Sequence, residues 1–135
     1  MNIFGIGTDI VSVQRFKKSI KNKNFLYRIF NKKEIAKCKQ VLSSSNCYAK
    51  RFAAKEAFSK ALGTGISNGI NFNEIIILNK KSGKPYISLI GETKKTLKKK
   101  FKGKRSRVSL SLSDEKKYAV AFVTITIWKK IKFFT

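Results

Sequence analysis

Residues 51–66 read Arg51-Phe52-Ala53-Ala54-Lys55-Glu56-Ala57-Phe58-Ser59-Lys60-Ala61-Leu62-Gly63-Thr64-Gly65-Ile66, and this stretch decides the fold. Its small and apolar residues recur at i, i+3, i+4, i+7 and i+8, the spacing of one face of an α-helix. These residues are Ala54, Ala57, Phe58, Ala61 and Leu62. Glu56 and Lys60 share another side, and the glycines from Gly63 onward end the helix. We therefore expect a helix that buries one face and presents an acid and a lysine on another.

The first residues of the chain predict a strand from Ile3 to Val11. Alternation places Gly5, Gly7 and Asp9 on one face of this strand. Glycine leaves the main chain uncovered, so we expect a ligand to approach the backbone beside the Asp9 carboxylate.

The remaining pattern alternates between basic helices and hairpins. Residues 13–39 predict two short basic helices, and residues 43–46 a loop. Further along, the expected elements are a hairpin of residues 74–78 and 85–90, a basic helix over 93–101, and a second hairpin of 108–113 and 118–128. This order predicts an α+β fold, a mostly antiparallel sheet with packed helices, in one domain covering residues 1–135.

Composition favours a globular, cytoplasmic protein. The hydrophobic fraction is 42%, and no run approaches the roughly 20 apolar residues that span a bilayer. The first residues lack the features of a signal peptide. We therefore predict that the only cysteines, Cys38 and Cys47, are free thiols in a reducing compartment.

The net charge of +24 calls for an anionic partner or another explanation. Nucleic acid, an anionic membrane, an acidic protein and a phosphorylated ligand all fit such a charge. Lysine far outnumbers arginine, so an AT-rich genome also explains part of the excess as lysines on solvated faces. Histidine is absent, which excludes histidine-dependent hydrolases and most zinc enzymes. Chemistry in this chain must use carboxylates, lysines, metal-bound water or the substrate.

Asp9 and Glu56 are two of only 7 acidic residues, and they predict a magnesium site. Magnesium accepts one or two carboxylates together with substrate phosphate oxygens. Lys60 and Arg51 can neutralise those oxygens, and the Gly63–Gly65 backbone can approach them. Each feature also has a simpler explanation: a helix cap, an i,i+4 ion pair and a helix stop. Only their combination favours a site for phosphoryl transfer.

The two segments resemble the signatures of the holo-[acyl-carrier-protein] synthases, the small bacterial 4′-phosphopantetheinyl transferases. Gly5-Ile6-Gly7-Thr8-Asp9-Ile10-Val11 matches the opening strand of that family, and residues 51–66 match its helix. The likeness continues at residues 68–70, 83–85 and 113–119, and so covers nearly the whole chain.

This resemblance implies transfer of 4′-phosphopantetheine from coenzyme A to a serine of apo-acyl carrier protein, releasing adenosine 3′,5′-bisphosphate, in fatty acid biosynthesis. It implies that Asp9 and Glu56 hold Mg²⁺, with Glu56 and Lys60 catalytic. The coenzyme-binding residues it implies are Arg51, Lys60, Gly63, Thr64, Gly65 and Pro85.

The resemblance also implies a partner and an assembly. Carrier proteins are acidic, so Arg15, Lys18, Lys21 and Arg28 are the expected docking residues. Family members of this size are homotrimers with sites between subunits. Many carry a histidine at a position near Ser111 or Leu112; this chain has none, which favours water or Glu56 as the base.

Two other functions compete with the transferase. The basic run from Lys94 to Arg107 can bind nucleic acid backbone, although no base-reading motif accompanies it. A catalytically dead relative could serve as a carrier-protein chaperone, against which the intact metal ligands argue. The segment from Trp128 to Phe134 could touch a membrane, but a packed tail is the simpler explanation. We predict neither a specific nucleic acid partner nor a membrane partner.

Overall fold

The computed structural model describes residues 1–63 and 69–129 and has an α+β fold, as predicted. The helices are α1 (Val13–Ser19), α2 (Lys23–Ile29), α3 (Lys32–Lys39), α4 (Ser44–Leu62) and α5 (Gly91–Lys100), with a 3₁₀ turn, η1 (Phe72–Glu74). The strands are β1 (Asn2–Ser12), β2 (Ile75–Asn79), β3 (Pro85–Leu89), β4 (Arg105–Asp114) and β5 (Tyr118–Trp128). No helix within the described ranges is both long and apolar enough to cross a membrane.

The strands form two separate antiparallel sheets. One has the order β1-β5-β4, and the other is the β2-β3 hairpin. In the larger sheet, Gly7 lies opposite Val123 and Asp9 opposite Ala121. Both predicted hairpins, β2-β3 and β4-β5, are confirmed.

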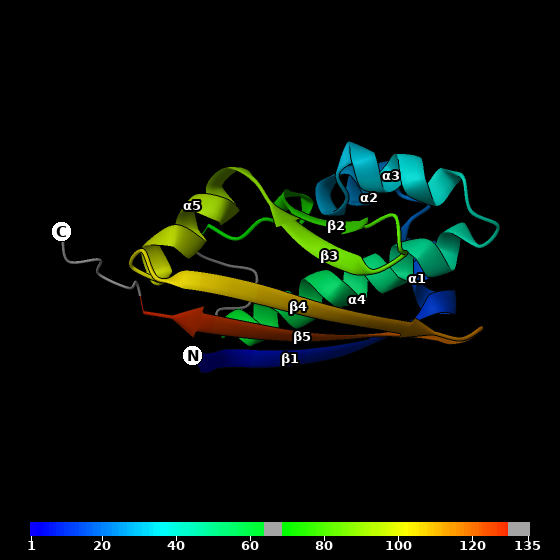
Figure 1. Ribbon diagram of the computed structural model, residues 1–135. Helices are drawn as coiled ribbons and strands as arrows, with labels where there is room; N and C mark the ends of the chain where they lie inside the picture. The colour runs from blue at the N-terminus through cyan, green and yellow to red at the C-terminus, as the bar shows by residue number, and fades with distance from the viewer. Residues whose placement is uncertain (64–68, 130–135) are drawn as a thin grey trace.

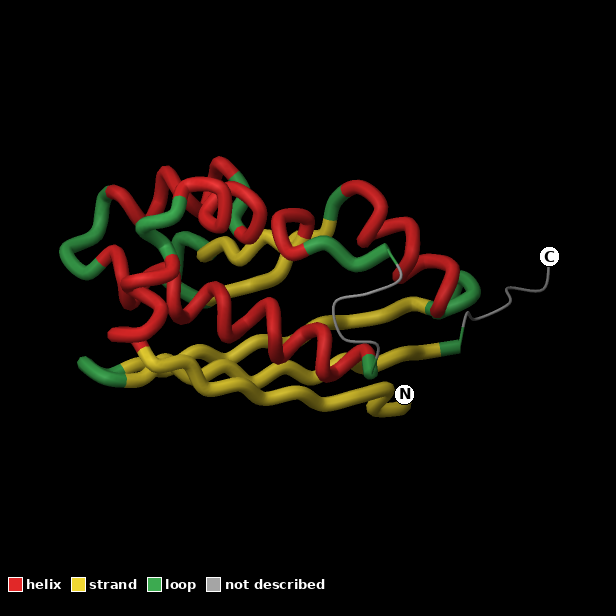
Figure 2. The backbone as a smooth tube through the Cα atoms, turned by 180° about the vertical axis from the view of Figure 1, so that it is seen from behind, coloured by secondary structure: helices red, strands yellow, loops and turns green. Residues whose placement is uncertain are grey.

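Helix α4 forms the middle layer of the molecule, between the larger sheet and the β2-β3 hairpin with its neighbouring helices (Figures 1 and 2). The predicted apolar stripe, from Ala54 to Leu62, is buried. The helix also buries Arg51, Lys55 and Ser59, which recur every four residues and therefore form a polar stripe on another face. Because both sides of α4 are covered, the helix is more buried than a single amphipathic stripe predicts.

Gly5 and Gly7 allow α4 to lie directly against β1. A Cβ atom on Gly7 would lie 2.8 Å from the Ala61 nitrogen and 2.9 Å from the Ala57 carbonyl carbon, and closer still to the Ala57 oxygen. A Cβ atom on Gly5 would meet the Ala61 carbonyl in the same way. The expected role of these glycines as an open backbone for a ligand is therefore wrong, since the α4 main chain occupies that space.

The region before α4 differs from the prediction in two ways. Residues 13–39 form three helices instead of two, because Asn31 starts α3 with a capping box that includes Glu34. The predicted loop over residues 43–46 is wrong beyond Ser43, because α4 begins at Ser44. The Asn46 amide donates to the Asp114 carboxylate and to the Glu115 carbonyl, each at 2.9 Å, so contacts with the β4-β5 turn stabilise this first turn of α4.

The predicted free thiols are instead joined, in a disulfide between Cys38 and Cys47. The chain reverses between α3 and α4, which brings the two Cα atoms to 5.4 Å, within the range that a disulfide spans. Both cysteines are buried. The prediction failed because it was based on compartment and took no account of this packing.

A buried ion pair connects α4 to the layer that contains α3, η1 and the β2-β3 hairpin. The Lys55 ammonium donates to the Glu34 carboxylate at 2.7 Å and to the carbonyls of Phe72 and Ile75 at 2.8 and 2.7 Å. The Ile77 amide donates to the same carboxylate at 3.2 Å. Burial lowers the pKa of Lys55 to about 8, although the Glu34 charge opposes that shift. The pair fixes α3, η1 and β2 against the helix that carries Glu56.

Candidate active site

Asp9 and Lys60 meet where β1 crosses the last turns of α4. The Lys60 ammonium donates to the Asp9 carboxylate at 3.0 Å and to the Thr8 carbonyl at 3.0 Å. The Asp9 side chain is only 17% exposed, while that of Lys60 is 55% exposed. Asp9 shares a face of β1 with Gly5 and Gly7, as predicted, but this face lies against α4, and Lys60 contacts Asp9 from the solvent side.

Glu56 is one helical turn before Lys60 and belongs to the same group. Burial raises the pKa of the Glu56 carboxyl, the neighbouring Asp9 charge raises it further, and Lys60 opposes both effects. The structure thus brings together the three residues that the sequence singled out, from two elements far apart in the chain.

The chemistry of these donors fits a hard divalent cation. A carboxyl whose pKa is raised by burial and by a neighbouring carboxylate, as that of Glu56 is, ionises more easily when a cation lies between the two carboxylates. Within the described ranges, no group of three or more His, Cys, Asp or Glu side chains could hold a metal. Two carboxylates, those of Asp9 and Glu56, match the small protein contribution that magnesium sites typically have, where water and phosphate supply the other ligands.

Arg51 is in a second group, on the opposite side of α4. Its guanidinium donates to the Cys47 carbonyl at 3.3 Å, to the Cys47 sulfur at 3.1 Å and to the Asn79 side chain at 3.0 Å. Arg51 is buried, its Nε has no hydrogen-bond partner, and burial lowers its pKa. None of the ion pairs between described residues includes Arg51.

A cavity of about 480 Å³ opens beside Arg51 and carries a strongly positive lining. Its lysines are Lys37, Lys50, Lys80 and Lys81. One carboxylate, that of Asp114, is also present and lies 3.3 Å from the Lys50 ammonium. A cavity with this excess of cations and an arginine lacking a counterion suits a phosphate-bearing ligand.

Of the other predicted coenzyme-binding residues, those that the structure describes do not line the cavity beside Arg51. Gly63 ends α4 in the left-handed conformation, with φ 80°, so its role as a helix stop is confirmed. Thr64 and Gly65 lie outside the described residues. Pro85 begins β3 opposite Asn79 but does not line the cavity beside Arg51.

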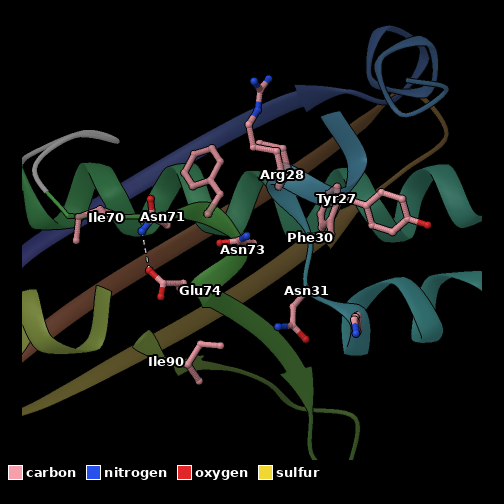
Figure 3. A pocket seen from close by; sticks show the side chains of 12 residues that line it. Tyr27, Arg28, Phe30, Asn31, Ile70, Asn71, Asn73, Glu74 and Ile90 are labelled. Carbon is pink, nitrogen blue, oxygen red and sulfur yellow. Dashed lines mark hydrogen bonds between the residues drawn. The ribbon is translucent and has the colours of Figure 1, made fainter. Parts of the chain in front are cut away.

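The four predicted docking residues are all exposed. Arg15 and Lys18 lie on α1, Lys21 in the following turn and Arg28 on α2, so they belong to two helices instead of one. Arg28 also lines a cavity of about 910 Å³, together with Tyr27 and Asn31 (Figure 3). This cavity contains none of the site residues Asp9, Glu56 and Lys60, so its size does not mark the chemistry.

Glu74, at the edge of that cavity, has a structural role. Its carboxylate accepts hydrogen bonds from the Asn71 side chain at 2.7 Å (Figure 3) and from the Glu92 and Thr93 amides at 2.9 and 3.2 Å. Burial acts to raise its pKa, but these hydrogen bonds outweigh burial and lower it. Glu74 thus caps α5 from outside the helix.

Two parts of the site escaped the sequence analysis. Asn79 was missed because it lies at the end of β2, distant from Arg51 in sequence, and contacts Arg51 only in the folded protein. The Lys55–Glu34 pair was also missed, although the i,i+4 spacing of Arg51, Lys55 and Ser59 could have indicated a buried polar stripe.

Comparison with known proteins shows which family the chain belongs to. Residues 5–123 match the model of the 4′-phosphopantetheinyl transferase superfamily. The chain is 49% identical over 125 residues to a holo-[acyl-carrier-protein] synthase of Pelagibacter ubique, covering 93% of this chain and 98% of that relative.

Solved structures give the same result. The crystal structure of the synthase from Neisseria meningitidis matches with a TM-score of 0.83 at 42% identity, over 93% of this chain and 99% of that one. The synthase from Bacillus anthracis, in complex with CoA (3′,5′-ADP), matches with a TM-score of 0.75 at 34% identity, over 91% and 96%.

The chain therefore belongs to the 4′-phosphopantetheinyl transferase superfamily and, within it, to the holo-[acyl-carrier-protein] synthases. The predictions of the family, of its fold and of an enzyme are confirmed.

Proposed function

We propose that residues 1–135 act as one domain that transfers 4′-phosphopantetheine from coenzyme A to a serine of apo-acyl carrier protein. The reaction depends on Mg²⁺ and releases adenosine 3′,5′-bisphosphate, as part of cytoplasmic fatty acid biosynthesis. The observation that carries this proposal is the group of Asp9, Glu56 and Lys60 at the crossing of β1 and α4.

Each residue of this group has a role in the transfer. Asp9 and Glu56 would hold the magnesium, which supplies neutralisation of the charge on the transferred and leaving phosphates. Glu56 accepts the proton of the attacking serine directly or through water. The serine oxygen then bonds to the phosphorus that carries the pantetheine arm, and the bond from that phosphorus to the bridging oxygen of the pyrophosphate breaks. Lys60, held by Asp9 and Thr8, contacts the phosphates and protonates the leaving group.

The cavity beside Arg51 would receive the nucleotide end of coenzyme A. The guanidinium binds a phosphate that supplies its missing counterion, and the neighbouring lysines add to the attraction. Gly63, Thr64 and Gly65 would form a wall against the pyrophosphate, and Pro85 would lie on the adenine side.

The placement of these groups on α4 favours a site shared between two copies of the chain. Lys60 is nine residues after Arg51, which corresponds to about 180° around a helix. Accordingly Arg51 contacts Asn79 of β2, whereas Lys60 contacts Asp9 of β1. One coenzyme molecule reaches both groups more easily if they come from neighbouring subunits.

The outer face of the larger sheet supplies a surface for such an assembly. Ile6 and Ile10 on β1 and Phe122 on β5 point away from α4 and are 60%, 64% and 45% exposed. Exposed apolar clusters of this kind mark interfaces. We therefore propose that this face packs against other copies in a homotrimer, as expected for the family.

Docking of the carrier protein is assigned to the exposed cations Arg15, Lys18, Lys21 and Arg28. Arg15 and Lys18 lie on α1, which begins directly after β1, the strand that carries Asp9. Attraction between opposite charges mainly raises the association rate and weakens with salt.

Intact-mass spectrometry of an apo-acyl carrier protein, incubated with the enzyme, coenzyme A and Mg²⁺, tests the reaction. The expected result is the gain of one phosphopantetheine, which a chelator abolishes. Asp9→Ala and Glu56→Ala should abolish the gain while leaving the denaturation midpoint near that of the wild type. Gain of the group with either variant at saturating magnesium would refute the metal assignment.

Mixing two inactive variants tests the shared site. Asp9→Ala and Arg51→Ala subunits, refolded together, should recover activity because about a quarter of the sites in random trimers combine two intact halves. If both halves came from one chain, the mixture would stay inactive. Sedimentation of Phe122→Glu, which should dissociate the assembly, provides the control.

A further inference from the structure

An apolar groove of about 630 Å³ opens between the two sheets, at the end of the molecule where α5 lies. The edges of β3 and β4 approach each other there without forming a ladder, since the two strands belong to different sheets. The apolar residues that line the groove are Ile87, Leu89, Leu97, Phe101 and Val108. The groove includes none of the residues assigned to the transferase site.

The polar part of the lining is cationic. Lys94, Lys98 and Lys104 line the groove, and no acidic residue does. Residues 91–107 contain nine lysines and arginines and one acid, Glu92, whose carboxylate lies 3.6 Å from the Lys95 ammonium. All three lining lysines are exposed, so they can direct their ammonium groups to a ligand in the groove while their stems cover apolar surface.

We propose that this groove binds an anionic amphiphile with a single acyl chain and a negatively charged head. Ligand sites typically hold about 300–1,000 Å³ and combine an apolar lining with a few polar groups that orient the ligand. An apolar floor beneath three lysines matches a chain and a charged head in that arrangement. The basic run that the transferase function leaves unexplained thus acquires a role.

A polyanion such as nucleic acid would satisfy the lysines but not the floor. Binding by nucleic acid follows counterion release and gains nothing from an apolar surface. An extended membrane surface would meet the exposed cations, but it would not place a chain between the two sheets. The apolar floor between the two sheets therefore favours a single free amphiphile.

Titration calorimetry with dodecanoate, below its micelle concentration, tests the proposal on the full-length protein. Saturable binding is expected, and decanoate should bind about fifteenfold more weakly, because each buried methylene contributes about fourfold. Dodecyltrimethylammonium, with the same chain and the opposite charge, should not bind. Equal affinity for the two charges or for the two chain lengths would overturn the proposal.

Two neighbouring lysines of α5 provide a matched comparison. Lys98→Glu should weaken dodecanoate binding at least tenfold, whereas Lys99→Glu, which makes the same charge change on a residue outside the groove, should change it less than twofold. Ser106→Tyr should weaken binding by filling the groove without altering charge. Equal loss in both lysine variants would indicate nonspecific attraction, and binding to anionic vesicles or RNA but not to dodecanoate would indicate a macromolecular partner; either result would refute the proposal. None of these readouts requires transferase activity.

Discussion

Gly7→Ala should destabilise the protein and disable its active site, although it adds a single methyl group. Ordinary contact with a Cβ atom begins at 3.4 Å, so the Ala57 carbonyl carbon, 2.9 Å away, would have to retreat by about half an ångström and its oxygen by more. The obstacle is the main chain of α4, which cannot turn aside as a side chain can.

The expected loss of unfolding free energy is about 2–3 kcal/mol. Overpacking costs about 1–3 kcal/mol and sometimes more, and a main-chain obstacle belongs at the upper end of that range. Alanine also restricts the unfolded chain, which returns about 0.4–1 kcal/mol. The same displacement stretches the 3.0 Å bond between Lys60 and Asp9, so activity should fall by roughly ten- to a hundredfold.

Urea denaturation and the carrier-protein mass assay measure the two effects. Thr8→Ala, on the outer face of the same strand, is the control: it adds no atom and removes the hydrogen bond to the Ala121 carbonyl, about 1 kcal/mol. Adding Ala57→Gly to Gly7→Ala should not restore stability, because the obstructing atoms are main-chain atoms. A Gly7→Ala protein within 1 kcal/mol of the wild type and fully active would refute the reasoning.

Lys55→Met should cost about 3–5 kcal/mol in urea denaturation, since it leaves the buried Glu34 charge without its partner; a loss below 1 kcal/mol would show that the pair is not desolvated. Glu74→Gln should be less stable than the wild type at neutral pH. The difference in stability should vanish as the pH falls below the ordinary pKa of the carboxyl and through its lowered folded-state pKa, because the unfolded chain binds more protons in that range. A stability difference that does not change with pH would contradict the capping role. The disulfide closes a short loop, with a sequence separation of 9 residues, so the oxidised protein should be more stable than the reduced one by roughly 2.5 kcal/mol. In Cys47→Ser, reductant should no longer change the stability. If reductant lowered the stability of that variant by the same amount, the disulfide between Cys38 and Cys47 would not be the source of the difference.

The periodicity of the sequence correctly predicted the buried stripe of α4 and the alternation of side chains along β1. The stripe from Ala54 to Leu62 was recognisable because a helix face repeats every 3.6 residues, and the side of β1 that carries Asp9 because strands alternate. The residue types of Asp9, Glu56 and Lys60, and not these patterns, singled out the group at the candidate site, because neither pattern shows which face of the strand meets the helix.

The errors arose where residues distant in sequence determine the structure. Gly5 and Gly7 accommodate a helix that begins nearly forty residues later, which no local pattern reveals. The disulfide of Cys38 and Cys47 depends on how α3 and α4 pack, and the buried face around Arg51 depends on β2. Propensity could not identify these contacts, because they exist only after the layers have assembled.

The pairing of β1 with β5 has a consequence for synthesis of the chain. Asn2 lies opposite Ile127, and Asp9 opposite Ala121, so the strand that carries Asp9 is made early and its hydrogen-bonding partner more than a hundred residues later. Chains emerge from the ribosome in order, at roughly 5–20 residues per second. A nascent chain therefore contains both Asp9 and Lys60 for several seconds before the sheet that aligns them can close. During that interval β1 exposes unpaired edges and an apolar face, and a chaperone is expected to bind it there.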